Sequence, residues 1–180
     1  NVLRANSDIA IMDFSGTEAI PFLTAILGLD INKLTASGLG LRSSLDDDLT
    51  SSYAYALYYF NETAFRFVLG KDASVQLQSL INEQQLRYDI DYVMRDDLSA
   101  LTLSGEQAFD ALVDSFKLTP GLRLSDMRSC YGAQSGEVFI TAIDNQATQQ
   151  FQLVARQAEL DKWQTHLQQL GFDLALANVA

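Results

Sequence analysis

The sequence predicts an α+β fold made of two similar halves, and three observations lead to that prediction. A ten-residue stretch, FSGTEAIPFL, begins at Phe14, and a similar stretch, LSGEQAFDAL, begins 89 residues later at Leu103. A second pair of segments, FRFVL and FQLVA, is separated by 86 residues. In both halves the expected order of elements is strand, helix, hairpin, helix, strand. Matching order and spacing indicate an internal repeat. We therefore expect one domain made of duplicated βαββαβ-like halves, at about residues 1–95 and 96–180.

The first half opens with the apolar segment IAIMDF, which predicts a strand over Ile9–Phe14. The residues SGTE that follow have the form of a capping box, and apolar residues three and four positions apart predict a helix after it. Because Pro21 would break hydrogen bonding inside a helix, the helix is expected to start at Thr17 or later. A Gly-rich loop then leads to a hairpin of YAYALYYF over Tyr53–Phe60 and AFRFVL over Ala64–Leu69.

The first half closes with a helix and a strand. Apolar residues at helical spacing from Ala73 to Ile81 predict the helix, and LRYDIDYVM over Leu86–Met94 predicts the strand. The run Asp46-Asp47-Asp48 lies earlier, between the Gly-rich loop and the hairpin. It has no nearby His, Cys or Glu that could complete a cation site, so we expect a solvated loop there.

The second half repeats this order. LSALTL from Leu98 predicts a strand, and SGEQ from Ser104 forms a second capping box at the start of a helix. EVFITAI from Glu137 and QFQLVA from Gln150 predict the second hairpin. A stripe of Leu and Trp residues predicts the last helix, which Gly171 should end, and FDLALANV closes the half as a strand.

Composition excludes several classes of function. The net charge of -11 argues against a nucleic-acid partner, because affinity for a phosphate backbone comes from Lys and Arg. The longest apolar stretches are about ten residues, shorter than the ~20 that span a bilayer, and no leader segment opens the chain, so no membrane partner is expected. The single cysteine, Cys130, excludes an internal disulfide and favours a cytoplasmic protein.

The stretch IAIMDFSGTEAIPFLTAILGLDINKLTASGLGLRSSLDDD, from Ile9 to Asp48, resembles the opening of the glycine cleavage T-protein family, the tetrahydrofolate-dependent aminomethyltransferases. Gly16–Ala19 stands where that family has its Gly-Pro-Asp-Ala helix start. LSGEQAFDAL is similar to the family's internal Gly-Pro-x-Ala repeat. Ser135-Gly136-Glu137 is similar to the end of its Tyr-Thr-Gly-Glu motif. The resemblance covers essentially the whole chain.

The resemblance implies a duplicated folate-binding domain in which first strands are exchanged between halves. It also implies a pterin site in a central channel and tetrahydrofolate as the cofactor. One site residue is carried over, Glu137, because the family's matching glutamate lies close to the pterin. A carboxylate can accept hydrogen bonds from both a ring nitrogen and an exocyclic amine, as it does from a guanidinium group.

Three positions depart from the family's pattern. Its Val-Asn-Ala segment reads Val68-Leu69-Gly70 here, and the aspartate that orients the methylene-transferring amine falls at Val75 or Gln76. Asp72 is close by, but we expect it to cap the helix that it precedes. The tyrosine of the Tyr-Thr-Gly-Glu motif is replaced by Gln134. The sequence therefore predicts that the domain does not catalyse aminomethyl transfer.

Three functions follow from these observations. The first is a non-catalytic, T-protein-like domain that binds tetrahydrofolate or a similar heterocycle. The second is a protein-interaction subunit, like the small folate-domain-like subunit of heterotetrameric sarcosine oxidases. The third is an aminomethyltransferase completed by another chain, since the family's C-terminal barrel does not follow Ala180. Leu69, Val75 and Gln76 argue against the third function.

Two reactive residues lie outside these motifs. Cys130 stands beside an aromatic residue in a predicted strand, which is typical of an inert core residue. His166 is the only histidine and has no Cys or His partner at ligand spacing, so we expect it at the surface or at the edge of the last helix's apolar stripe.

Overall fold

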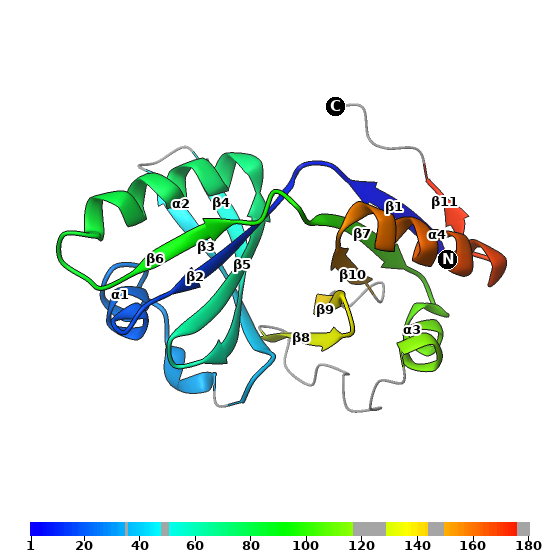
Figure 1. The fold of residues 1–180 in the computed structure, drawn as a ribbon, viewed down its shortest axis with the longest axis horizontal. Coiled ribbons are helices and arrows are strands. Elements are labelled where there is room, and N and C mark those ends of the chain that lie inside the picture. The colour runs from blue at the N-terminus through cyan, green and yellow to red at the C-terminus, as the bar shows by residue number, and fades with distance from the viewer. Residues whose placement is uncertain (35, 48–50, 117–128, 144–149, 176–180) are drawn as a thin grey trace. The chain divides into compact units, whose positions relative to one another are not determined.

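In the computed structural model the chain forms two compact units, and each has its own set of strands, helices and core (Figure 1). The first unit is Asp8–Asp96, and the second unit joins Asn1–Ser7 to Asp97–Ala180. The structure describes residues 1–34, 36–47, 51–116, 129–143 and 150–175. The division differs from the one drawn from the sequence chiefly in its first seven residues, which belong with the second unit.

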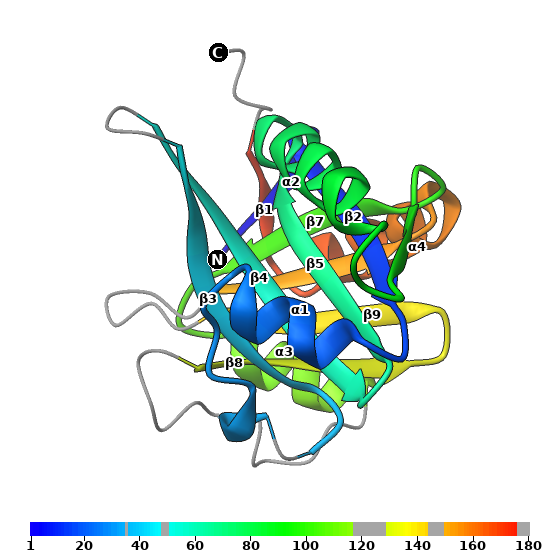
Figure 2. The same cartoon turned by 90° about the vertical axis from the view of Figure 1, so that its left-hand side faces the viewer.

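The first unit is an antiparallel sheet with two α-helices. Its strands are β2 (Ile9–Ser15), β3 (Leu39–Asp47), β4 (Ser51–Asn61), β5 (Ala64–Gly70) and β6 (Asp91–Met94). They are ordered β3-β4-β5-β2-β6 across the sheet. The helices are α1 (Ala19–Ala25) and α2 (Lys71–Gln84), and a short 3-10 turn, η1, spans Ile31–Lys33. Figure 2 shows α1 and α2 on one face of this sheet.

The core of the first unit lies between this sheet and its helices. Alternate residues of β2 and β5, such as Phe14 and Phe67, face the helices, as the two-residue period of a strand requires. Phe22 from α1 and Leu77 from α2 meet them from the other side. The rings of Phe14 and Phe22 lie 5.4 Å apart, within the range of favourable aromatic contacts.

β3 corrects one expectation. The Gly-rich stretch and the aspartate run were both expected to be loop, but Leu39–Asp47 forms a strand against β4. Gly40 lies opposite Tyr58, and Asp46 lies opposite Ser52. Asp48 lies outside the described residues. The leucines of this segment alternate only partly with its polar residues, so the strand pattern in the sequence is weak. Pairing with the long strand β4 decides its conformation.

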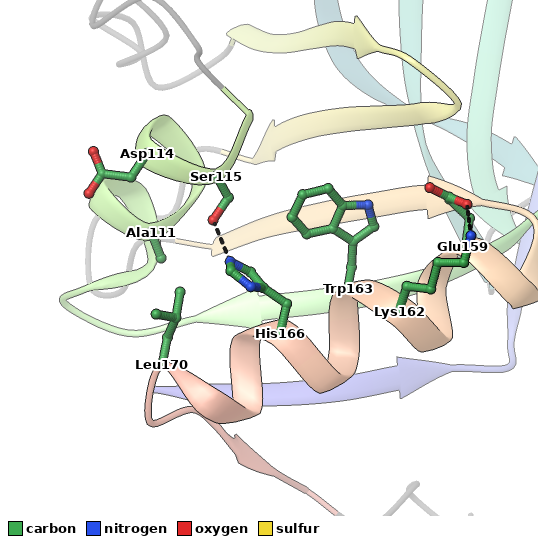
Figure 3. Close-up of a pocket in the computed structure, with 8 residues that line it drawn as sticks. All are labelled: Ala111, Asp114, Ser115, Glu159, Lys162, Trp163, His166 and Leu170. Carbon is green, nitrogen blue, oxygen red and sulfur yellow. Dashed lines mark hydrogen bonds and ion pairs between the residues drawn. The ribbon is translucent and has the colours of Figure 1, made fainter.

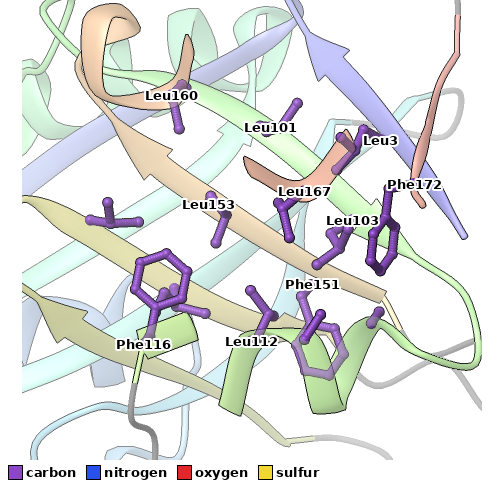
Figure 4. Packing of buried hydrophobic residues seen from close by; sticks show 14 of the residues in the cluster. Leu3, Leu101, Leu103, Leu112, Phe116, Phe151, Leu153, Leu160, Leu167 and Phe172 are labelled. Carbon is purple, nitrogen blue, oxygen red and sulfur yellow. The ribbon is translucent and has the colours of Figure 1, made fainter. Parts of the chain in front are cut away.

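The second unit has the same kind of architecture. Its strands are β1 (Val2–Asn6), β7 (Ser99–Ser104), β8 (Ser129–Ser135), β9 (Val138–Ile143), β10 (Gln150–Ala155) and β11 (Asp173–Leu174), and its helices are α3 (Ala108–Phe116) and α4 (Gln157–Gln169). The strand order is β11-β1-β7-β10-β9-β8. Figure 4 shows Leu112 from α3, Phe151 from β10 and Leu167 from α4 converging in the core. Both units, and the chain as a whole, are therefore α+β.

The first strand of the chain belongs to the second unit. β1 runs antiparallel to β7, with Val2 opposite Ser104, and in the first unit β6 runs antiparallel to β2, with Asp91 opposite Ser15. β1 therefore occupies the place beside β7 that β6 occupies beside β2. β11, which follows α4, pairs with the far side of β1 in parallel.

The capping box expected at α1 does not form. The N-cap residue is Glu18, which makes no side-chain cap hydrogen bond. Its carboxylate instead accepts a hydrogen bond from the backbone N–H of Asp89 at 3.0 Å, and its own N–H donates to the Asp89 carbonyl at 3.1 Å. Gly16 has φ +149, and a Cβ there would lie 2.1 Å from that carbonyl oxygen. The glycine therefore permits the segment before β6 to approach the strand-to-helix junction.

Gly105 has the matching role in the second unit. A Cβ at Gly105 would lie 2.4 Å from the side-chain oxygen of Asn1, and φ is again positive, at +129. The side-chain oxygen of Asn1 accepts a hydrogen bond from the N–H of Gln107 at 3.1 Å. The repeated Ser-Gly pair thus marks a site where a second segment of backbone packs against the junction.

The remaining elements form where the sequence predicts them, but some are shorter than predicted. The strand expected over Leu86–Met94 is confined to β6, and the one expected after Phe172 is confined to β11. Gly171, with φ +100, follows α4 as expected of a residue that ends a helix. Among the described residues, every helix is too short or too polar to pass through a lipid bilayer.

Candidate functional site

Glu137 lies in the tight turn between β8 and β9, and its side chain is exposed. Gln134, which replaces the motif's tyrosine, donates from Nε2 to the carbonyl of Gly136 at 2.9 Å and so holds this turn. Val138 is in the core beneath α3 and α4, so by alternation Glu137 belongs with Phe139 on the opposite, helix-free face. The role of Glu137 as a folate ligand stays a prediction.

Three polar residues form a row across the helix-free face of the second unit. Gln152 on β10 lies opposite Thr102 on β7 and opposite Thr141 on β9. Gln152 is only 3% exposed and Thr141 is fully buried. Thr141 donates from its hydroxyl to the backbone carbonyl of Gln152 at 3.5 Å. The side-chain oxygen Oε1 of Gln152 is buried and has no hydrogen-bond donor among the described residues.

A buried acceptor without a donor lowers the stability of the folded state by roughly 1–3 kcal/mol. Gln152 is therefore an unusual residue at the centre of a strand. Phe139 lies on the same face, two residues along β9 from Thr141. Its ring lies over Gly132, where a Cβ would come within 2.2 Å of the ring. An unpaired acceptor near an aromatic ring can bind a flat molecule that carries N–H donors.

The corresponding row in the first unit is fully paired. Arg66 on β5 lies opposite Asp13 on β2 and opposite Tyr58 on β4, the same register as in the second unit. Its guanidinium binds the Asp13 carboxylate at 2.7 and 3.2 Å, and Arg95 adds a contact at 2.8 Å. Burial raises the pKa of Asp13, but hydrogen bonds and charge from Arg66 and Arg95 outweigh it and hold the pKa below its usual value of 3.8. This row is a structural ion-pair network.

The positions of the family's transfer residues carry no carboxylate in this chain. Leu69 is buried in the core of the first unit, whereas Val75 is 60% exposed on α2. Gln76 is exposed as well and lines a groove beside α2. The expectation that Asp72 caps α2 is wrong. The N-cap is Gly70, and Asp72 lies within the first turn, where its charge still favours the helix dipole.

The other two sequence candidates also lie in the second unit. The backbone of Cys130 is in β8, and its side chain lies outside the described part of the structure. His166 is exposed on α4, as expected, with its Nε2 3.2 Å from the hydroxyl oxygen of Ser115. Within the described residues, no group of three His, Cys, Asp or Glu side chains could hold a metal ion.

A protein of known structure has a similar fold. The crystal structure of glycine cleavage system aminomethyltransferase T from Bartonella henselae matches 96% of this chain with a TM-score of 0.76 and 19% sequence identity. The two proteins share a fold. The match covers 47% of the Bartonella protein, so this chain spans about half its length. No family model matches the sequence. The expected T-protein-like fold is therefore confirmed.

Sequence reasoning missed Gln152, although one signal pointed to it. The segment FQLVA is apolar except for its glutamine, and the matching FRFVL is apolar except for Arg66. A polar residue at the same place in two apolar strands is the signal that could have marked both rows.

Proposed function

We propose that this chain is a T-protein-like domain that does not catalyse aminomethyl transfer and that binds tetrahydrofolate or a similar flat heterocycle. The binding site is on the helix-free face of the second unit, with the exposed Glu137 and the buried Gln152 and Phe139 as its ligand-contacting residues. The observation that carries the proposal is the buried, unpaired side-chain oxygen of Gln152.

The chemistry of a pterin suits these residues. Its ring presents an amide N–H and an exocyclic amine side by side, which match the two oxygens of a carboxylate such as Glu137. A further N–H donor would satisfy Gln152, and the flat ring would pack with Phe139. The shared fold and the Ser135-Gly136-Glu137 segment support a folate over other heterocycles.

Two replaced positions support the proposed absence of catalysis. An amine that receives or donates a methylene group must be oriented by a charged or strongly polar partner. Leu69 is aliphatic and buried in the core, and Val75 and Gln76 are exposed on α2. These side chains supply no carboxylate for that purpose.

We also infer that the two units arose by duplication of one βαββαβ-like module, which the extra strands β3 and β8 extend. The element order after the first strand is the same in both units. The paired rows support this: Asp13 and Arg66 face each other in the first unit, as Thr102 and Gln152 do in the second. These pairs have the offsets of 89 and 86 residues found in the sequence repeats. Exchange of a first strand explains why β1 lies in the second unit.

Calorimetric titration with tetrahydrofolate tests the ligand. We expect saturable binding by the wild-type protein, and a dissociation constant at least about tenfold higher for Glu137→Gln and for Gln152→Leu, which is about 1.4 kcal/mol each. Gln152→Leu should leave the protein as stable as before or more so, because it removes a buried unpaired acceptor.

Glu106→Gln is the matched control, since Glu106 is another exposed glutamate of the second unit. It should bind like the wild type. Without saturable binding by the wild-type protein the proposal fails, and the protein-interaction subunit becomes the better hypothesis. An equal loss in Glu106→Gln would show that Glu137 contributes only charge.

A further inference from the structure

A groove lies between α3 and α4 on the helix-covered side of the second unit, away from the face considered above (Figure 3). Its volume is about 620 Å³, within the range of about 300–1,000 Å³ typical of small-molecule sites. Aromatic, hydroxyl and charged side chains line it together, so it differs from an ordinary gap between apolar helix faces.

The floor of the groove is Trp163, which is half-buried. Its indole stacks on Phe116 with ring centres 4.0 Å apart, and the ring of His166 meets it edge-on at 5.5 Å. Ser115 on α3 reaches across to His166 on α4, with 3.2 Å between its hydroxyl oxygen and Nε2. Figure 3 shows these two side chains pointing toward each other across the space between the helices.

The first unit has a groove at the corresponding place, with a different lining. Counting from the matching helix starts, Ile26 stands where Ser115 does, and Leu80 stands where His166 does. Both line a groove of about 540 Å³. Leu77, fully buried, stands where Trp163 does. Aliphatic residues are thus sufficient to pack two helices on such a sheet, so packing alone does not require Ser115, Trp163 and His166.

The charges around the second unit's groove favour a cation. Asp114 and Glu159 contribute two carboxylates, and Lys162 contributes one ammonium group that lies 3.5 Å from Glu159. One negative charge is therefore in excess, in a protein whose net charge is -11. An anionic ligand would be repelled, whereas a protonated amine would be attracted to the carboxylates and to the indole face.

We propose that this groove binds a small aromatic amine. The ring packs against Trp163, the Ser115–His166 pair lines the polar wall, and the ammonium group lies toward Asp114 at the rim. The site does not depend on folate binding, because it lies on the other side of the same sheet and uses none of the same residues.

Nuclear magnetic resonance tests the proposal with the full chain, because the one Trp gives a single indole N–H signal and the one His gives a single set of imidazole signals. Three probes share a ring and differ in charge: phenethylamine, 2-phenylethanol and phenylacetate. We expect phenethylamine to shift both signals saturably, with a dissociation constant at least about tenfold below that of phenylacetate.

Two variants and one control complete the test. Ser115→Ile with His166→Leu, which copies the first unit, should weaken phenethylamine binding at least about tenfold. Asp114→Asn, at an exposed position, should weaken phenethylamine and leave 2-phenylethanol unchanged. Gln168→Leu, exposed on α4, should bind as the wild type does. No saturable shift, equal binding of phenylacetate, or an Asp114→Asn variant that binds phenethylamine undiminished would each overturn the proposal.

Discussion

Asp13 is held between two arginines on the helix-free face of the first unit. Arg66 binds both of its oxygens and is itself buried, and the guanidinium also lies 5.7 Å from the ring centre of Phe60. The pKa of Asp13 is lowered in the folded state, so the folded protein binds this proton more weakly than the unfolded chain. The stabilisation is therefore fully present above the unfolded pKa and is lost as the pH falls through the folded pKa.

Asp13→Asn is expected to lower the free energy of unfolding by roughly 1–3 kcal/mol near pH 7, because it leaves Arg66 buried without its carboxylate. The difference from the wild type should shrink as the pH falls below about 4, as Asp13 becomes neutral in both states. Urea denaturation across this pH range measures it. If the difference in free energy of unfolding stays constant across this pH range, the ion pair is not its cause.

Gly16 is a residue whose importance comes from a neighbour far along the chain. Gly16→Ala should lower the free energy of unfolding by roughly 2–5 kcal/mol, from backbone strain and from the clash with the Asp89 carbonyl. Gly28→Ala is the matched control, because Gly28 also has a positive φ, +66, and nothing lies within 4 Å of its missing Cβ. Gly28→Ala should lower the free energy of unfolding by only about 1–2 kcal/mol. Equal losses in thermal or urea unfolding would contradict the close approach.

At the scale of elements, β1 is the clearest case of a strand whose partner is remote in sequence. Leu3 is fully buried in the core of the second unit, beside Leu103 on β7. The five-residue segment VLRAN is too short to give a local sign of this burial. The strand contributes both hydrogen bonds to β7 and a pairing edge for β11.

Leu3→Ala should lower the free energy of unfolding by about 2–5 kcal/mol, because it leaves a cavity in that core. Hydrogen exchange should speed up in β7 and β10 before it does in β2 and β5, since each unit has its own core. Leu174→Ala on β11, where the leucine is 45% exposed, should change stability by less than about 0.5 kcal/mol. Faster exchange confined to the first unit would be inconsistent with the position of β1.

At the scale of the whole molecule, the strands of the two units pair in matching registers. A residue pair from one unit can therefore be copied into the other to test the duplication. Gln152→Arg alone should lower the free energy of unfolding by about 3–5 kcal/mol, because it buries an unpaired charge. Adding Thr102→Asp, which copies Asp13 and Arg66, should restore at least about 1 kcal/mol of this loss. A double-mutant cycle by urea unfolding measures the coupling. No favourable coupling would weaken the inference of duplication.

The sequence by itself determined the α+β class, the helices and most strands, and the repeated order, because periodicity and turn residues act over a few positions. It also identified Glu137 as a candidate ligand through a short motif. It missed the strands β1 and β3 and the roles of Gly16 and Gly105. It also missed Gln152 and the groove above Trp163. Only the tertiary structure decided these, because each depends on which distant strand or helix becomes a neighbour, and such pairing leaves no periodic signal in the chain.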